Sequence, residues 1–512
     1  MRFGYAGVSW AFLALAAAAL LVADVGITAL HPAAELGRLL AGVFRPDFAA
    51  VGVTSVVLTV AFAILGVSGG AVAGLMLSLA YGQSSAVRGF CAAIRSVHEL
   101  FWALLLMQIA GPSPITGLLA IAIPYAGIFA KVFSEMIEEA NLQADRVLPR
   151  GTGAVSRFAY ARAPELAAPM GNYLLYRFEC GMRSTLVLGF IGLPTMGFEL
   201  ESYFRQGHYA EAAAFVAVFY GLIATRRLWI RPWTLPLLLI GSVVALAMLA
   251  PSVTGDSIWT ALARFFGHDI VPRPLRMADL GAASTWLGLA NWLWAIVRLQ
   301  VAPGVVATLV VSQIALVAAA ALALLLFPLT TEAYTGPLGR PLGRALLVVI
   351  RSTPEYMVAY VLLQLLGPSM LPAVIALAAH NGGIIAFLMG RHAGTLRYRP
   401  DAPRRADLYF WETLPRLYGQ FLAYGLYRWE IIVRESAVFG ILGVRTLGYH
   451  VDAAISELRL DTAVVLIVAT GMLSMAIDAL SRWLRRRLRV DQASLQLSPG
   501  ARAVMHPEPA AA

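Results

Sequence analysis

The chain has 512 residues, of which 59% are hydrophobic and only 13% are charged. Soluble globular domains carry about 25% charged residues, so this composition excludes a soluble protein. The formal net charge of +10 is typical of a membrane protein with basic cytoplasmic loops, and we predict no nucleic-acid partner. With only two cysteines, a disulfide framework and a cysteine-rich metal site are both excluded.

Apolar stretches long enough to cross a hydrocarbon layer of about 30 Å recur along the whole sequence. The amino-terminal stretch is interpreted as a first span and not as a signal peptide, because a similar run recurs at 235–250. Basic loops assigned to the cytoplasm complete the topology of an all-α polytopic protein with about twelve transmembrane helices. The predicted spans are 10–30, 52–81, 96–110, 114–136, 174–193, 207–225, 233–250, 304–328, 352–366, 371–390, 425–444 and 461–480.

Two blocks of polar residues recur in the same order within the apolar sequence. Ile-Arg-Ser at 94–96 recurs 256 positions later at 350–352, and each copy is followed by Gln and then Gly-Pro-Ser. Tyr-Arg-Phe-Glu at 176–179 recurs 251 positions later as Tyr-Arg-Trp-Glu at 427–430. Such matches indicate a tandem duplication.

We therefore divide the chain into a first repeat at 1–228, a second repeat at 229–490 and a disordered cytoplasmic tail at 491–512. Six spans in each repeat is an even number, so both repeats have the same orientation in the membrane, as parallel repeats. Two long polar loops, at 138–170 and 392–419, then lie in the cytoplasm.

The first of these loops carries a recognisable pattern. Asp145 precedes Gly151 by six positions, and Ala163 and Pro164 follow. The loop resembles the cytoplasmic loop of permease subunits of ATP-binding-cassette (ABC) importers, which reads Glu-Ala-Ala, three residues, Gly, nine residues, Ile-x-Leu-Pro. The resemblance implies a coupling loop that docks on an ATPase subunit, with the glycine making a turn between two short helices.

The second loop matches this pattern less well. Leu414 and Pro415 repeat its ending, but Ala402 stands in place of the glycine and Leu396 in place of the acidic residue. We expect this loop to dock more weakly or asymmetrically.

A narrower resemblance follows from the residues after the first loop. Tyr-Arg-Phe-Glu at 176–179 is followed by Arg183, by Gly-Phe-Ile-Gly at 189–192 and by Gly-Phe-Glu-Leu at 197–200. This segment is similar to the permeases of phosphonate and phosphite importers, which are usually single-repeat chains that dimerise. The resemblance implies a fused, non-enzymatic permease of the bacterial inner membrane that carries phosphonate, phosphite or phosphate. It also implies a cytosolic ATPase dimer and a periplasmic substrate-binding protein as partners.

The charged residues of the fifth span in each repeat are candidates for the translocation pathway. Glu179 and Arg183 are four residues apart with the acid first, as are Glu430 and Arg434, so each pair shares one helix face. A charge in mid-membrane costs about 2.5 to 3.5 kcal/mol. Two interpretations remain open: a structural ion pair, or guanidinium groups that face an anionic substrate. The full candidate set is Arg177, Glu179, Arg183, Arg428, Glu430 and Arg434.

Four glycines after these spans mark either a broken helix at a gate or close helix packing; they are Gly192, Gly197, Gly443 and Gly448. The eight histidines show no metal-ligand spacing, so we predict neither a metal site nor a cofactor.

The energy source is also constrained by the sequence. The chain lacks Gly-x-x-x-x-Gly-Lys-Ser/Thr, so it cannot bind ATP in a phosphate loop and must be driven by another chain or by an ion gradient. A secondary transporter of two six-helix halves fits the duplication equally well, although it leaves the long cytoplasmic loops unexplained. An intramembrane enzyme is disfavoured because no pairing of nucleophile and base is evident in the spans.

Overall fold

The computed structural model describes residues 4–139, 148–149, 151–250, 258–276 and 279–490. Within these residues every regular element is helical, which confirms the all-α prediction. Seven helices are long and apolar enough to cross a membrane, or up to nine if each of two bent helix pairs forms one span. The chain is a multi-pass membrane protein.

Each of the twelve predicted spans overlaps a helix. Three of these helices do not have both the length and the hydropathy of a membrane span. Helix α12 (Leu235–Leu249) has only 15 residues. Helices α9 (Ala163–Val187) and α19 (Leu414–Ser436) are long enough, yet charged side chains lower their hydropathy. Length and composition therefore establish up to nine spans in the described part of the chain, not twelve.

One compact unit contains residues 39–250 and 258–265. At its centre α3 packs on α6, α9 and α12. Glycines on α3 permit the close approach of α6, since a Cβ at Gly74 would overlap the Phe129 side chain. Besides α9 and α12, this unit contains η1 (Phe48–Ala50), α3 (Val53–Tyr81), α4 (Ser85–Ser96), α5 (Glu99–Ala110), α6 (Pro114–Glu139), α8 (Ala154–Arg157), η2 (Phe158–Arg162), η3 (Leu188–Ile191), α10 (Met196–Gln206), α11 (Tyr209–Trp229) and α13 (Ile258–Arg264).

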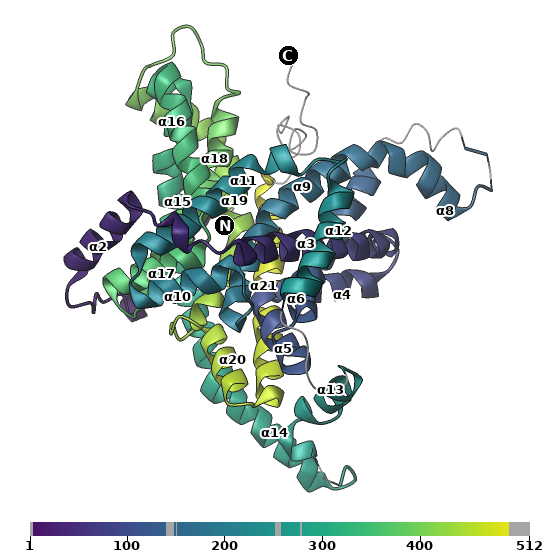
Figure 1. Cartoon of the computed structure of the whole chain (residues 1–512). Coiled ribbons are helices and arrows are strands. Elements are labelled where there is room, and N and C mark those ends of the chain that lie inside the picture. Colours follow the sequence, from purple (N-terminus) through teal and green to yellow (C-terminus); the bar gives the residue numbers. More distant parts are fainter. Residues whose placement is uncertain (1–3, 140–147, 150, 251–257, 277–278, 491–512) are drawn as a thin grey trace. The chain divides into compact units, whose positions relative to one another are not determined.

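The other compact unit contains residues 4–38 and 266–490. Its central helix α15 packs on α1, α18 and α19, and a core around Phe327 and Met389 is fully buried. Besides α19, the elements are α1 (Tyr5–Val22), η4 (Phe265–Asp269), η5 (Arg273–Leu275), α14 (Ala283–Ile296), η6 (Val297–Val301), α15 (Ala302–Leu326), η7 (Phe327–Thr330), α16 (Glu332–Ser352), α17 (Glu355–Leu366), α18 (Met370–Ala393), η8 (Leu408–Thr413), η9 (Val438–Gly440), α20 (Leu447–Ser456) and α21 (Leu460–Leu488). In sequence, the division between the units falls within α2 (Pro32–Phe44). Figure 1 shows the helices coloured along the chain.

The first helix of each predicted repeat belongs to the compact unit of the other repeat. Helix α1 lies in the unit of α15 to α21, where the Gln313 amide donates a hydrogen bond of 3.1 Å to the carbonyl of Phe12. The Phe12 ring meets Trp429 edge to face at 4.9 Å. Helix α12 packs instead on α3. The repeat boundary at 228 and 229 stays a prediction about the sequence, whereas the compact units combine segments from both sides of it.

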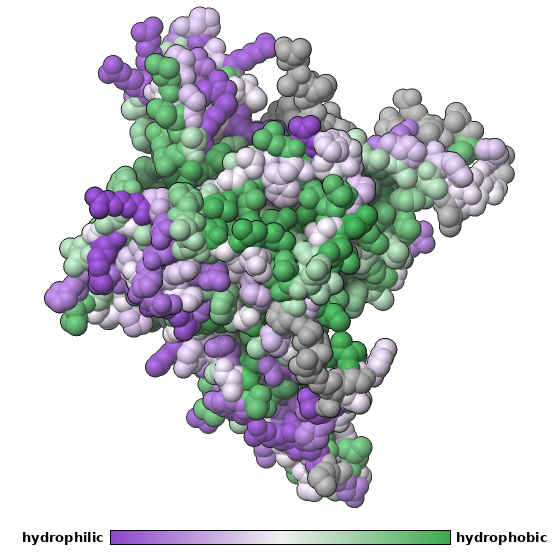
Figure 2. Space-filling model, in the orientation of Figure 1, coloured by the Kyte–Doolittle hydropathy of each residue, from purple (hydrophilic) through white to green (hydrophobic). Residues whose placement is uncertain are grey.

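Large apolar side chains are exposed on the spanning helices. Val72 and Met76 of α3 are exposed, as are Leu237 and Ile240 of α12. Figure 2 shows a continuous apolar surface over these two neighbouring helices. An apolar patch of this kind is unfavourable in water and is expected where lipid covers the protein.

Candidate translocation site

Each candidate site begins at a sharp bend between two helices. Helices α4 and α5 meet at 90°, and α16 and α17 meet at 86°. The residue that begins the second helix of each pair is a glutamate, Glu99 or Glu355. The two bends lie at the 256-residue offset of the repeat, so the duplication is retained in the backbone.

A histidine lies beside each of these glutamates. The distance from His98 Nε2 to Glu99 Oε2 is 3.8 Å, and the distance from His380 Nε2 to Glu355 Oε2 is also 3.8 Å. The two histidines are not repeat-equivalent, because position 354 is proline and His380 corresponds to Pro124. Each repeat thus places a histidine beside its glutamate, but the two histidines come from different sequence positions.

The first-repeat cluster consists of Glu99, Tyr125, Arg177 and Ser184. The Ser184 hydroxyl donates to Glu99 Oε1 at 2.8 Å, and the Tyr125 hydroxyl lies 3.3 Å from Ser184 Oγ. The guanidinium of Arg177 lies 6.0 Å from the centre of the Tyr125 ring, and its Nε donates to the hydroxyl of Tyr173 at 2.8 Å. A chain of polar contacts therefore joins three helices, α5, α6 and α9.

The second-repeat cluster consists of Glu355, Asn381, Arg428 and Glu435, which occupy the equivalent positions. Arg428 Nε donates to Asn381 Oδ1 at 2.7 Å. The Asn381 amide donates in turn to Glu435 Oε2 at 3.0 Å, and Asn381 is completely buried. Because a charged guanidinium strengthens its hydrogen bonds, Arg428 fixes the orientation of the whole amide.

Sequence reasoning identified Arg177 and Arg428 but missed the residues that hold them. Tyr125 and Asn381 are related by the 256-residue offset, and Ser184 and Glu435 by the 251-residue offset. These positions carry different residue types in the two repeats, so a search for repeated motifs does not detect them. The offsets themselves were the signal that could have found them.

Glu179 forms an ion pair that the sequence did not predict. Its Oε2 lies 2.8 Å from the guanidinium of Arg226 on α11, whereas the predicted partner was Arg183 on the same helix. Arg183 Nη2 lies 3.7 Å from Cys180 Sγ. In the second repeat Glu430 and Arg434 are half-buried on α19.

The four candidate glycines lie where the fifth predicted span of each repeat ends. Gly192 and Gly443 have φ values of +81° and +87°, a left-handed conformation that favours glycine. A Cβ at Gly197 would overlap the carbonyl oxygen of Leu186, and one at Gly448 would overlap that of Ala437. The glycines thus combine a helix break with close backbone contact in both repeats, and their role as a gate stays a prediction.

The first predicted coupling loop is described in part, and Asp145 lies outside the described residues. Gly151 has φ +96°, as expected for a glycine that makes a turn. A π-helical turn, η2, then leads into α9, whose first two residues are Ala163 and Pro164.

The second predicted coupling loop has a similar ending and a different turn. The π-helical turn η8 leads into α19, which begins at Leu414 and Pro415. The residue with positive φ is Arg405, at +57°, and not Ala402, which replaces the glycine in sequence. Because an L-residue is strained at positive φ, this turn is less favourable than its counterpart at Gly151.

Ion pairs and aromatic contacts hold the second loop in place. The buried Glu412 accepts a hydrogen bond from Arg399 at 2.9 Å and forms an ion pair with Arg416 at 2.6 Å. The Tyr409 hydroxyl donates to the carbonyl of Leu324 at 2.9 Å, and burial raises the pKa of this hydroxyl. Despite its divergent sequence, the loop has a defined structure.

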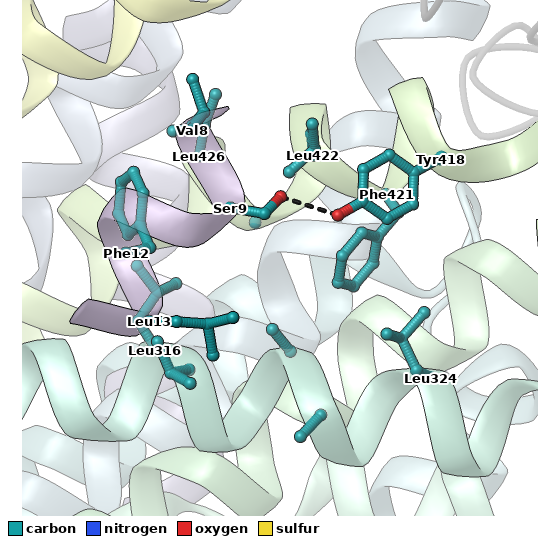
Figure 3. A pocket seen from close by; sticks show the side chains of 14 residues that line it. Val8, Ser9, Phe12, Leu13, Leu316, Leu324, Tyr418, Phe421, Leu422 and Leu426 are labelled. Carbon is teal, nitrogen blue, oxygen red and sulfur yellow. Dashed lines mark hydrogen bonds between the residues drawn. The ribbon is translucent and has the colours of Figure 1, made fainter. Parts of the chain in front are cut away.

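A cavity of about 220 Å³ lies between α1, α15 and α19. Among the described residues that line it, only Ser9 and Tyr418 contribute polar side chains, and their hydroxyls are 2.7 Å apart (Figure 3). Leu316, Leu324 and other apolar residues form the remaining wall. Such a lining suits an apolar group and not an oxyanion, so the polar clusters are the better candidates for the anion pathway.

Known proteins similar to this chain are transport permeases. The phosphate-import permease protein PhnE of Mycolicibacterium smegmatis is 25% identical over 493 residues, covering 86% of each chain. The phosphite transport system permease protein PtxC of Stutzerimonas stutzeri is 30% identical over 134 residues, which are 26% of this chain and 48% of PtxC.

A shorter match involves the putative cryptic phosphonate transport system permease protein PhnE2 of Escherichia coli, 26% identical over 20% of this chain and 84% of that protein. No family model matches the chain, and no solved structure matches it. The chain is therefore similar to permease subunits of phosphate, phosphite and phosphonate transport systems. The repeated Tyr-Arg-aromatic-Glu motif and the glycine turns of its all-helical membrane fold agree with this similarity.

Proposed function

We propose that this chain is the membrane permease subunit of an ABC importer and translocates a small phosphorus oxyanion across the bacterial inner membrane. The observation that carries the proposal is the similarity to a phosphate-import permease over 86% of both chains, joined to a multi-pass fold. Permeases for phosphate, phosphite and phosphonate all occur among the similar proteins. The shared substrate chemistry is a compact anion with several phosphoryl oxygens.

Arg177 and Arg428 are the residues that we expect to meet this anion. A guanidinium presents several N–H donors in a fixed plane and suits phosphoryl oxygens. Arg428 uses Nε to bind Asn381, and Arg177 uses Nε to bind Tyr173. In both cases the Nε contact restrains the guanidinium, so each arginine is oriented before the substrate arrives. Arg183 and Arg434, one turn or more along the same helices, are proposed as further parts of the pathway.

The driving force is proposed to come from a separate cytosolic ATPase dimer, with a periplasmic binding protein delivering the substrate. Gly151 and the η2 turn support this assignment in the first repeat, and the Glu412 ion pairs support a second preformed docking loop. Binding and hydrolysis of ATP by the partner would move the coupling loops. The permease would then alternate between outward-open and inward-open states, each stabilised by a different ligand.

Reconstituted vesicles test the proposal. The permease, its ATPase subunit and its binding protein are placed in liposomes, and uptake of labelled phosphate, phosphite and methylphosphonate is followed. We expect uptake of at least one anion that requires ATP and persists when ionophores collapse the ion gradients. Uptake that needs an ion gradient and no ATPase would instead identify a secondary transporter.

The arginine assignment has its own variant. Arg428→Lys keeps the charge but loses the planar donor set, so uptake should fall at least tenfold while the protein stays folded. Arg340→Gln is the matched control, since Arg340 forms an exposed ion pair with Glu332 outside the cluster. Equal uptake by Arg428→Lys and wild type would refute the role of Arg428.

A further inference from the structure

Three side chains with metal-ligating atoms converge in the second repeat. Glu355 of α17, His380 of α18 and Glu435 of α19 each point one ligand atom into a space where all three atoms lie within 4.8 Å of one another. His380 is 1% exposed and Glu355 9%, and Glu435 is half-buried. The residues are 25 and 55 positions apart in sequence, which explains why histidine spacing gave no indication of them.

We propose that Glu355, His380 and Glu435 bind a divalent transition-metal ion such as Zn²⁺ or Mn²⁺. One imidazole and two carboxylates are a ligand set that these ions accept, whereas Mg²⁺ and Ca²⁺ prefer oxygen ligands alone. Ligand atoms of a tetrahedral ion are about 3.4 Å apart, given metal–ligand distances of about 2.1 Å. Inward movement of the side chains by about 1 Å would therefore complete the coordination.

The orientation of His380 supports a role as ligand. Its Nδ1 lies 2.9 Å from the carbonyl oxygen of Thr353, and a carbonyl can only accept, so Nδ1 carries the proton. In the neutral ring Nε2 then presents its lone pair on the side of Glu355. Metal-binding histidines commonly have their second nitrogen held by a backbone carbonyl in this way.

The distance between His380 and Glu355 is compatible with two ligands of one ion. The separation of Nε2 and Oε2 is 3.8 Å, close to the spacing of about 3.4 Å between ligands of a tetrahedral ion. His98 and Glu99 have the same separation in the first repeat. The second repeat differs because Glu435 converges on the pair as a third ligand.

The Glu435 carboxylate is also oriented by a neighbouring side chain. Asn381 donates to its Oε2 at 3.0 Å, and Arg428 fixes the Asn381 amide. Bound carboxylates in metal sites usually accept such a hydrogen bond. Thr353 thus orients His380, and Asn381 orients Glu435. Neither Thr353 nor Asn381 is itself a proposed ligand.

The two repeats differ in the number of carboxylates at the cluster. Two neighbouring carboxylates are costly to bury, and a divalent cation would lower that cost. Arg428 also reaches the cluster, through Asn381. In the first repeat Ser184 replaces Glu435 and Pro124 replaces His380. That repeat has one carboxylate, which accepts a hydrogen bond from Ser184. The metal site is therefore proposed for the second repeat alone.

Metal binding can be measured without any transport assay, so the test of this site is independent of the proposed function. The full chain, purified with its ATPase partner, is stripped with a chelator and titrated with Zn²⁺, Mn²⁺ and Co²⁺. We expect one ion per chain and, with Co²⁺, a visible absorption spectrum of a nitrogen- and oxygen-liganded ion. A wild-type chain that takes up no ion, or whose His380 simply binds a proton, overturns the proposal.

Glu435→Ser is the informative variant because it installs the residue of the first repeat at the same position. We expect its Kd for Zn²⁺ to rise at least 100-fold. Asn381→Leu removes the hydrogen bond to Glu435 together with the contact to Arg428, and should raise the Kd about 10- to 100-fold. Glu457→Gln is the matched control, since Glu457 pairs with Arg459 away from the cluster, and it should bind as wild type. Should Glu435→Ser not fold, His380→Gln replaces it. Unchanged affinity in the folded variants refutes the site.

Discussion

The carboxylate of Glu179 lies 2.8 Å from the guanidinium of Arg226, across the interface between α9 and α11. Spacing along one helix had suggested Arg183 as the partner, four residues away. The ion pair links α11 to α9. It has no repeat counterpart, because the position 251 residues after Arg226 is Ile477.

This ion pair leads to a charge-reversal prediction. Arg226→Gln should leave the buried Glu179 unpaired and lower the free energy of unfolding by about 3 kcal/mol. Exchange of the charges, Glu179→Arg with Arg226→Glu, should recover most of that loss. Thermal unfolding in detergent measures the effect, and Arg227→Gln, at an exposed neighbouring position, is the control. A similar loss in the exchanged protein would show that the pair is not what stabilises this interface.

The same variant separates a structural from a functional role for Glu179. If the pair is only structural, the exchanged protein should both fold and transport. If Glu179 borders the pathway, the exchanged protein should be folded but should transport poorly, because a positive charge then replaces the carboxylate. Uptake normalised to folded protein in the membrane distinguishes these outcomes.

The fold was predictable where it depends on local sequence. Hydropathy predicted a helix at each of the twelve positions, and up to nine spans qualify by length and composition in the described part of the chain. The repeat followed from residues kept at fixed offsets. Gly151 and Gly192 were also recognisable, because positive φ restricts the residue type.

Tertiary partners were not predictable in the same way. Arg226, Asn381 and Glu435 acquire their roles from helices that are distant in sequence, and no spacing rule connects them. The exchange of α1 and α12 between compact units is another such feature, since both helices are uniformly apolar and could pack on many surfaces.

Gly197 should tolerate no side chain. A Cβ there would overlap the Leu186 carbonyl oxygen and carbon, and backbone atoms cannot rotate away. We expect Gly197→Ala to reduce the yield of folded protein severalfold, whereas Gly221→Ala, where a Cβ meets nothing within 4 Å, should be neutral or slightly stabilising. Size-exclusion profiles at equal expression compare the two. Equal profiles would contradict the close backbone contact between α10 and the end of α9.

One copy of this chain should assemble with two ATPase subunits, since the duplication supplies both halves of a permease pair. Native mass spectrometry of the solubilised complex gives the stoichiometry directly. Cross-linking through the two coupling loops, with single cysteines introduced in each, should give two distinct products with the ATPase. A complex with two copies of this chain for each ATPase pair would rule out the fused-pair interpretation.

The last prediction concerns Gly151, whose φ of +96° lies in a region that side chains other than glycine rarely adopt. A β-branched residue there should cost about 1 to 3 kcal/mol locally, through backbone strain. A Cβ at this position meets nothing within 4 Å, so Gly151→Val alters the turn without a steric clash. The membrane fold should survive this change, because the turn lies outside the spanning helices.

Gly153 provides a matched control two residues away. It is equally exposed, a Cβ there also meets nothing within 4 Å, and its φ is not positive. In vesicles with the ATPase and the binding protein, Gly151→Val should reduce substrate-stimulated ATP hydrolysis severalfold, while Gly153→Val should retain it. Ala402→Val should have less effect than Gly151→Val, because the positive φ of the second loop is at Arg405 and not at Ala402. Equal stimulation in all three variants would mean that the turn at Gly151 does not transmit the ATPase cycle.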